Sequence, residues 1–316
     1  MIPTGTPAAA TSRVAGIDCG TNSIRLLIAD LGDAGGAALT DIVREMRIVR
    51  LGQDVDRTGR LAPEAIERTR VALSDYAATI REHRAERVRM VATSATRDAE
   101  NRAAFVTMVR AVLGVDPEVI TGQDEARLSF TGAASVLPSA TGPLLVVDIG
   151  GGSTELVRGG DGRLRAHSMD VGCVRLTERH LHDDPPSAAQ IDATVDDLRA
   201  AIAAARADVP LDPDVTFVGV AGTVTTVAAI ALGLQRYDAS AIHGSTITAG
   251  QVHDVTDLLL RMTRDERAAL PVMHPGRVDV IAGGALVLRT LVDESGVDAV
   301  VASEHDILDG IALSLR

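Results

Sequence analysis

One pattern occurs twice in this chain, and it constrains the fold more than any other feature. The two segments read VAGIDCGTNSIRLLIAD, from Val14, and LLVVDIGGGSTELVRGG, from Leu144. Each has an apolar run, an Asp-x-Gly turn with small hydroxyl residues and a second apolar run, which predicts two strands joined by a tight turn. The repeat indicates two related domains that face each other across a cleft, with chance similarity of two hairpins as the alternative.

Strand-like and helix-like segments alternate through the rest of the chain. Expected strands span residues 13–17, 24–29, 41–49, 88–92, 144–148, 153–157, 164–169, 215–220 and 299–302. Expected helices span 63–83, 101–113, a segment that follows the N-cap Thr121, 174–180, 187–205, 224–232, 249–262, 278–291 and 306–315. This alternation predicts an α/β fold, with mixed sheets and helices on their faces.

Charge and composition narrow the classes of function. The 316 residues are 46% hydrophobic, which is enough for two ordinary cores. All 31 basic residues are arginine, so chemistry that needs a lysine is excluded. The net charge of -12 argues against a nucleic-acid partner, although a local arginine pocket could hold an anion.

The chain terminus and the cysteines bear on the cellular compartment. No apolar run approaches the roughly 18 residues of a membrane span, so we expect no membrane partner. Residues 1–13 carry no signal-peptide pattern and are expected to form a disordered tail. Cys19 and Cys173 lack metal-ligand spacing and are expected to be free thiols in a reducing compartment. We therefore expect a cytoplasmic protein.

The glycine-rich turns predict phosphate binding. Glycine permits positive φ and lets backbone N–H groups approach an oxygen closely. In the second hairpin, an anion-binding cradle would use Gly150, Gly151, Gly152, Ser153 and Thr154. A plain hairpin turn is the alternative. The matching turn of the first hairpin offers Asp18, Gly20, Thr21, Asn22 and Ser23. A third turn opens a helix, whose N-terminus favours another phosphate, at Gly222 and Thr223.

Two carboxylates in the second hairpin indicate a cation. A phosphate-binding turn that carries Asp148 and Glu155 would repel its ligand unless a cation mediates. Hard oxygen ligands beside phosphate favour Mg²⁺. The sequence therefore predicts a magnesium site at these two residues.

Eight motifs, in order along the chain, resemble the exopolyphosphatase and guanosine pentaphosphate phosphatase family. They read DCGTNSIRLL, RLGQDVDRTGRL, ATSATRDAEN, TGQDEARL, DIGGGSTEL, DVGCVRLTE, AGTVTT and DVIAGGALVL. The resemblance implies a two-domain actin-like ATPase (ribonuclease H-like) fold with an interdomain cleft. It also implies domain I at residues 14–125, joined by a C-terminal helix at about 303–316, and domain II at 126–302.

The resemblance assigns roles to further residues. The family's water-activating glutamate corresponds to Glu125, for which a carboxylate stabilising the first helical turn is the alternative. The family's cleft arginine corresponds to Arg97, whose planar guanidinium would bind phosphate. A surface salt bridge from Arg97 to Asp98 or Glu100 is the alternative. Arg175 is a weaker candidate of the same kind.

The function that the resemblance implies is hydrolysis of terminal phosphoanhydride bonds of inorganic polyphosphate, with Glu125 activating water. The resemblance leads us to expect a short form without the C-terminal helical domain that many longer relatives carry after the point that corresponds to Arg316, and therefore a preference for short chains. Guanosine pentaphosphate, losing its terminal 5′ phosphate, is the nearest alternative substrate. A small-molecule kinase and a non-catalytic alarmone-binding module are the rival functions. A homodimer is left open.

Overall fold

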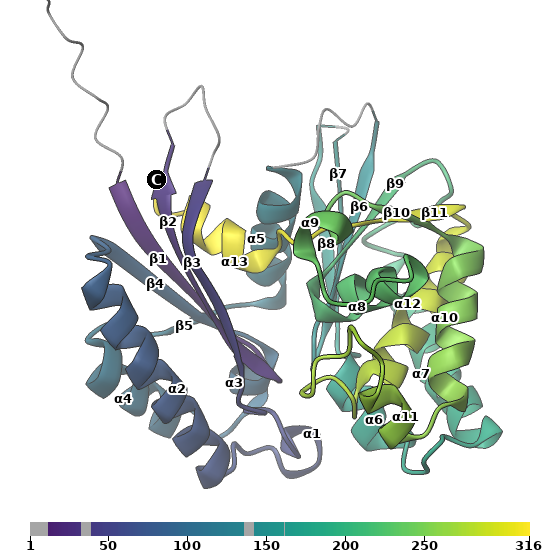
Figure 1. The fold of residues 1–316 in the computed structure, drawn as a ribbon, viewed down its shortest axis with the longest axis horizontal. Coiled ribbons are helices and arrows are strands. Elements are labelled where there is room, and N and C mark those ends of the chain that lie inside the picture. Colours follow the sequence, from purple (N-terminus) through teal and green to yellow (C-terminus); the bar gives the residue numbers. More distant parts are fainter. Residues whose placement is uncertain (1–11, 33–38, 136–141, 161) are drawn as a thin grey trace, which may run out of the picture.

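Two mixed sheets form the centres of two lobes that lie side by side (Figure 1). The computed structural model describes residues 12–32, 39–135, 142–160 and 162–316. The first sheet has the strand order β3-β2-β1-β4-β5, and the second has the order β10-β11-β9-β6-β7-β8. The expected α/β fold class is confirmed.

The strands of the first sheet are β1 (Ser12–Cys19), β2 (Ser23–Leu31), β3 (Leu39–Ile48), β4 (Arg87–Ala92) and β5 (Glu118–Val119). Those of the second sheet are β6 (Leu144–Ile149), β7 (Thr154–Gly159), β8 (Arg165–Met169), β9 (Thr216–Val220), β10 (Thr246–Thr248) and β11 (Ala299–Ala302). The helices are α1 (Val55–Thr58), α2 (Pro63–Glu82), α3 (Ser94–Asp98), α4 (Arg102–Leu113), α5 (Gly122–Ala134), α6 (Cys173–His180), α7 (Ala188–Ala205), α8 (Ala221–Ala231), α9 (Ala239–Ile242), α10 (Ala249–Arg261), α11 (Arg264–Ala268), α12 (Ile281–Ser295) and α13 (Ile307–Leu313).

The longer elements lie where their apolar periodicity predicts them. Sequence reasoning missed α1, α3, β5, α9, β10 and α11, which have two to five residues each and are too short to show a period. Strand β1 begins at Ser12, inside the expected tail, and residues 1–11 of that tail lie outside the described residues.

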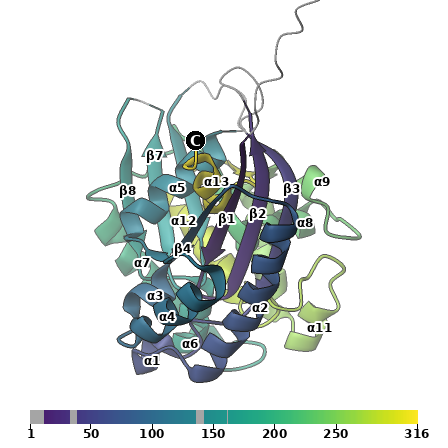
Figure 2. The same cartoon turned by 90° about the vertical axis from the view of Figure 1, so that its left-hand side faces the viewer.

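Helices cover both faces of the first sheet. On the outer face, α2 and α4 bury Leu73, Tyr76 and Phe105 against the strands (Figure 2). On the opposite face, Leu308 and Ala312 of α13 pack into one apolar cluster with residues of β1 and β2. Because both faces are covered, β2 reads as a nearly continuous apolar run.

The second sheet is built around its own hairpin. Strands β6 and β7 are antiparallel, and β9 runs parallel to β6. Helices α7, α8, α10 and α12 contribute to the large core on one face, which contains Val147 and Phe217. Helix α5 packs on the other face, where Ala126 and Ala133 join Val146.

Helices α5 and α13 pack against each other between the lobes (Figure 1). A Cβ on Gly132 would lie 1.8 Å from the carbonyl oxygen of Asp306, and a Cβ on Gly310 would lie 2.0 Å from that of Leu128. Only glycine allows the two backbones to come this close. The expected domain boundary between residues 125 and 126 falls inside helix α5. The division into domain I, at 14–125 with about 303–316, and domain II, at 126–302, therefore stays a proposal.

The two hairpins share one register and one turn. Across the antiparallel pairs, Asp18 faces Arg25 and Asp148 faces Glu155. The N–H of the glycine two positions after each aspartate donates to the carbonyl of the serine three positions on, in both turns at 3.0 Å. The repeated sequence pattern is therefore a structural repeat, and it sets the two Asp-x-Gly turns at equivalent places in the two lobes.

Candidate active site

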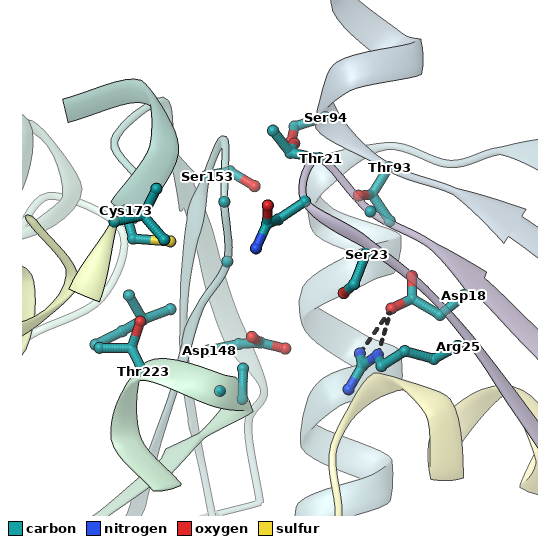
Figure 3. A pocket seen from close by; sticks show the side chains of 18 of the residues that line it. Asp18, Thr21, Ser23, Arg25, Thr93, Ser94, Asp148, Ser153, Cys173 and Thr223 are labelled. Atoms are coloured by element: carbon teal, nitrogen blue, oxygen red, sulfur yellow. Dashed lines mark hydrogen bonds and ion pairs between the residues drawn. The ribbon is translucent and has the colours of Figure 1, made fainter. Parts of the chain in front are cut away.

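A cavity of about 110 Å³ lies between the two hairpin turns. Figure 3 shows Asp148 and Ser153 on one side of it and Asp18, Thr21 and Ser23 on the other. Most predicted site residues line this cavity, namely Asp18, Gly20, Thr21, Asn22, Ser23, Glu125, Asp148, Gly150, Gly151, Ser153, Gly222 and Thr223. The structure thus brings together residues from four separate parts of the sequence.

The carboxylate of the first turn is paired inside the protein. Nε and Nη2 of Arg25 donate to Oδ2 of Asp18 at 3.0 and 2.6 Å. Burial raises the pKa of Asp18, while the positive charge of Arg25 acts in the opposite direction. The other oxygen, Oδ1, is buried and has no hydrogen-bond partner among the described residues.

The carboxylates of the second turn face each other with the same sign of charge. Asp148 accepts a hydrogen bond from Ser129, and Glu155 accepts one from Ser168 at 2.7 Å. Burial raises the pKa of Asp148 to about 7, and the charge of Asp306 adds to this. Burial also raises the pKa of Glu155, to which the charges of Glu125 and Asp148 add. An uncompensated pair of this kind favours protonation or a bound cation.

Glu125 lies in the first turn of α5 and is 7% exposed. The N-cap Thr121 accepts the N–H of Asp124, so the neighbouring acidic residue, and not Glu125, belongs to the helix cap. Nη1 of Arg97 donates to Oε2 of Glu125 at 3.0 Å and to the carbonyl of Ile120 at 3.2 Å. Burial raises the pKa of Glu125 to about 7, against the charge of Arg97, which suits a group that accepts a proton near neutral pH.

The glycine triplet allows the two turns to touch. A Cβ on Gly151 would lie 2.9 Å from Cβ of Thr21, and a Cβ on Gly152 would lie 2.5 Å from Oγ of Ser94. None of the three glycines has a positive φ. The expected left-handed backbone is therefore absent from the triplet, and these glycines allow close packing against Thr21 and Ser94.

Four predicted residues do not line the cavity, namely Arg97, Gly152, Thr154 and Glu155. Thr154 is fully buried, and its hydroxyl donates to the carbonyl of Val171 at 2.6 Å, so it supports the fold of the turn. Arg97 lies behind Glu125 and pairs with that carboxylate at 3.0 Å, and its binding of phosphate stays a prediction. Glu155 lies behind the turn, where Ser168 holds it.

Arg175 has a role that the sequence did not predict. Its guanidinium pairs with Asp56 at 2.8 Å and with Asp98 at 2.5 Å, and Arg179 pairs with Asp56 at 2.7 Å. These ion pairs join α6 of the second lobe to α1 and α3 of the first. Arg175 therefore connects the lobes beside the cavity.

Sequence reasoning missed several residues of the cavity wall. Arg25, Ser94 and Arg277 all line it. Arg25 could have been predicted from the sequence. It lies the same number of residues after the turn as Asp18 lies before it, so the two residues face each other in the hairpin. Arg277 comes from a loop far along the chain, and a Cβ on Gly222 would lie 2.6 Å from its guanidinium, which no local pattern reveals.

A second cavity of about 440 Å³ adjoins the first and shares Arg25, Met46, Ala221, Gly222 and Arg277 with it. Its further lining is largely apolar and includes Tyr237, Val272, Met273 and Leu308. The guanidinium of Arg277 lies 5.8 Å from the centre of the Tyr237 ring. The small polar cavity therefore continues into a larger apolar one.

The residues around the small cavity fit a divalent cation. Asp18, Glu125 and Asp148 line it, with Asp306 close behind, and the buried Oδ1 of Asp18 has no hydrogen-bond partner among the described residues. Within the described ranges, no three acidic, histidine or cysteine side chains form a ready-made metal cage. This arrangement suits Mg²⁺, which usually takes one or two carboxylates together with phosphate oxygens and water.

Among the helices of the described part, none is long and apolar enough to cross a membrane.

Both cysteines are buried free thiols, and burial raises the pKa of each, with Cys173 at about 11. Neither thiol is therefore a nucleophile near neutral pH.

The chain is similar to proteins of one family over nearly its whole length. The model of the Ppx/GppA phosphatase family matches residues 27–315. "Exopolyphosphatase 2" of Mycobacterium tuberculosis is 55% identical over 97% of this chain and 99% of that protein. A crystal structure of an exopolyphosphatase-like protein has a TM-score of 0.92 and 47% identity, and covers 96% of this chain and 98% of that one.

A solved member of the family from Aquifex aeolicus has a TM-score of 0.81 and 33% identity, and covers 96% of this chain and 97% of that one. More distantly, a nucleoside triphosphate hydrolase of Neospora caninum shares the fold, with a TM-score of 0.52 and 11% identity. The two-lobed α/β fold is therefore shared with these solved structures, and the chain is a phosphatase-family enzyme. With the family model matched across both lobes, this chain belongs to the Ppx/GppA phosphatase family.

Proposed function

We propose that this protein hydrolyses the terminal phosphoanhydride bond of inorganic polyphosphate and releases orthophosphate. One observation carries the proposal: two glycine and hydroxyl turns from different lobes meet at a small cavity that also holds a buried glutamate, Glu125. The cavity is of a size for phosphate groups. Relatives that carry the name exopolyphosphatase add support.

The turns would bind the phosphate groups. Thr21 and Ser153 contribute hydroxyls from opposite sides of the cavity (Figure 3). The N-terminus of α8, at Gly222 and Thr223, adds N–H donors and the positive end of the helix dipole. The guanidinium of Arg277 lies in the same wall. The substrate would therefore be held on several sides, which favours in-line attack on its terminal phosphorus.

Glu125 would orient the attacking water and accept its proton. Arg97 fixes the carboxylate of Glu125 through the hydrogen bond at 3.0 Å and leaves the other oxygen for water. A proton acceptor with a pKa near the working pH is the most effective one. Arg97 thus supports the base, where the sequence led us to expect a phosphate ligand.

A divalent cation would be held by Asp148, with Asp18 opposite it and Glu155 adding negative charge from behind the turn. When bound, such an ion neutralises phosphate charge and stabilises the charge that develops on the leaving group. The same ion would relieve the repulsion between the carboxylates of the second turn.

Guanosine pentaphosphate is a second candidate substrate. The observation that favours it is the apolar cavity of about 440 Å³ beside the phosphate cavity, where Tyr237 could contact a base. Inorganic polyphosphate would have no use for this apolar lining. Replacement of Tyr237 by alanine should then weaken hydrolysis of guanosine pentaphosphate and spare that of polyphosphate.

The test is one phosphate-release assay with four substrates: short polyphosphate, long polyphosphate, guanosine pentaphosphate and ATP. Polyphosphate should be the best substrate, and a preference for short chains stays a prediction. A guanosine pentaphosphate rate above both polyphosphate rates, together with its loss in Tyr237→Ala, would establish the second candidate. Release from none of the four would refute both.

A further inference from the structure

A buried ion triad behind the first turn ties it to the last helix of the chain. Arg25 donates twice to Oδ2 of Asp18, and its Nη1 pairs with Asp306 on its other side. The side chains of Asp18 and Asp306 are 7% and 5% exposed. Ion pairs with so little exposure are weakly screened by solvent and salt. The guanidinium is thus held between two carboxylates.

The same triad fixes the free oxygen of Asp18. Because Arg25 occupies Oδ2 with two hydrogen bonds, rotation of the carboxylate would break both charge-assisted bonds. Oδ1 is buried without a partner, while the residue Asp18 lines the phosphate cavity. Arg25 therefore fixes the orientation of the Asp18 carboxylate beside the cavity.

We propose that Asp306 is a positioning residue for hydrolysis: it anchors Arg25, and through Arg25 it orients Asp18 toward the cation-bound phosphate. This inference rests on the proposed function. Asp306 does not line the phosphate cavity, although it lines the adjoining one. Its influence on the reaction is therefore relayed and does not come from contact with the phosphate.

Asp306 also caps α13, and this second role must be separated from the first. Its Oδ1 accepts the N–H of Leu308 at 3.0 Å, and its own N–H donates to Asp309 at 3.0 Å. Asparagine and serine are good N-caps as well. The variants Asp306→Asn and Asp306→Ser therefore keep the cap and remove the charge that holds Arg25.

The test is a double-mutant cycle on the hydrolysis of tripolyphosphate, with Arg25→Met, Asp306→Asn and both changes together. Each Asp306 variant should lower kcat about 10-fold or more, because small misplacements in a site cost up to ~10²-fold. The Mg²⁺ concentration for half-maximal activity should rise, while KM at saturating Mg²⁺ stays within about twofold. In the Arg25→Met background, Asp306→Asn should have no further effect.

Asp309 provides a matched control. It is buried in the same helix and pairs with Arg44 at 2.6 Å, with no contact to Arg25. Asp309→Asn should therefore leave kcat unchanged per folded molecule. An equal loss of kcat in this variant would assign the effect to helix stability and overturn the proposal. Additive losses from Arg25→Met and Asp306→Asn would also overturn it, since Asp306 would then act directly on Asp148.

A binding measurement separates this inference from the proposed function. The rise in Tm caused by tripolyphosphate is measured against Mg²⁺ concentration for the wild type and the same variants. If the wild type releases no phosphate, the proposed function fails, yet Asp306→Asn and Arg25→Met should still raise the Mg²⁺ requirement for this Tm shift, without additivity. An unchanged requirement, or no Mg²⁺-dependent shift in the wild type, overturns the positioning role.

Discussion

The two hairpin turns have the same backbone and opposite electrostatics. At the position where the first turn sets Arg25 opposite Asp18, the second sets Glu155 opposite Asp148. In the first turn, an arginine balances the carboxylate inside the protein. In the second, the carboxylates are held by the hydroxyls of Ser129 and Ser168, which carry no charge.

The repeated hairpin turn can therefore have a different role in each lobe. A charge-balanced turn is complete within the fold and can act as a fixed wall for the substrate. A turn with two like charges favours protonation or a bound cation, and in our proposal it binds Mg²⁺. The two turns differ in the charge of the residue opposite the aspartate, which is positive at Arg25 and negative at Glu155. We infer that this difference separates the wall of the site from the cation-binding turn.

The largest effect should come from separating the two turns. Gly152→Ala would place a Cβ 2.7 Å from Oγ1 of Thr21 in the first turn and 2.5 Å from Oγ of Ser94, so the turns must move apart. Because both turns bind one substrate, kcat/KM should fall on the order of 10²-fold. Gly250→Ala is the control, since its Cβ would have 3.8 Å to the nearest atom, Oγ1 of Thr248. Wild-type kcat/KM in Gly152→Ala would show that the contact is dispensable.

A smaller effect should come from removing one of the like charges. Glu155→Gln takes away part of the negative charge behind Asp148, so the Mg²⁺ concentration for half-maximal activity should rise about 10-fold, equal to about 1.4 kcal/mol. Without Mg²⁺, Tm should rise, because two like charges no longer face each other. Glu118→Gln, at the edge of the first sheet, should change neither quantity. An unchanged Mg²⁺ requirement in Glu155→Gln would contradict the division of roles.

The smallest effect is expected at Arg175, outside both turns. Arg175→Ala removes ion pairs to Asp56 and Asp98, and the free energy of unfolding should fall by about 1 kcal/mol. Urea denaturation measures this loss. The KM for tripolyphosphate should change less than about threefold, because the guanidinium of Arg175 pairs with carboxylates of the other lobe and does not bind the substrate. A rise in KM beyond about 10-fold would restore Arg175 as a phosphate ligand.

Local patterns predicted the fold and most of the cavity, because strands, helices and tight turns are encoded by neighbouring residues. The two turns were found in this way, whereas Glu125 and its role came from the family resemblance. The ion pair of Arg25 with Asp306 joins residues at opposite ends of the chain, so no local pattern reports it. The same holds for Arg175, which meets its partners only when the lobes are assembled.

Glu125 carries the central claim, and one substitution tests it most directly. Phosphate release from tripolyphosphate is compared between the wild type and Glu125→Gln, with Tm measured to confirm folding. The glutamine keeps the shape and the hydrogen bond with Arg97 but cannot accept the proton of water. We predict a loss of about 10²- to 10⁴-fold in kcat at an unchanged fold. Release within about threefold of the wild-type rate would contradict the assignment of Glu125 as the base.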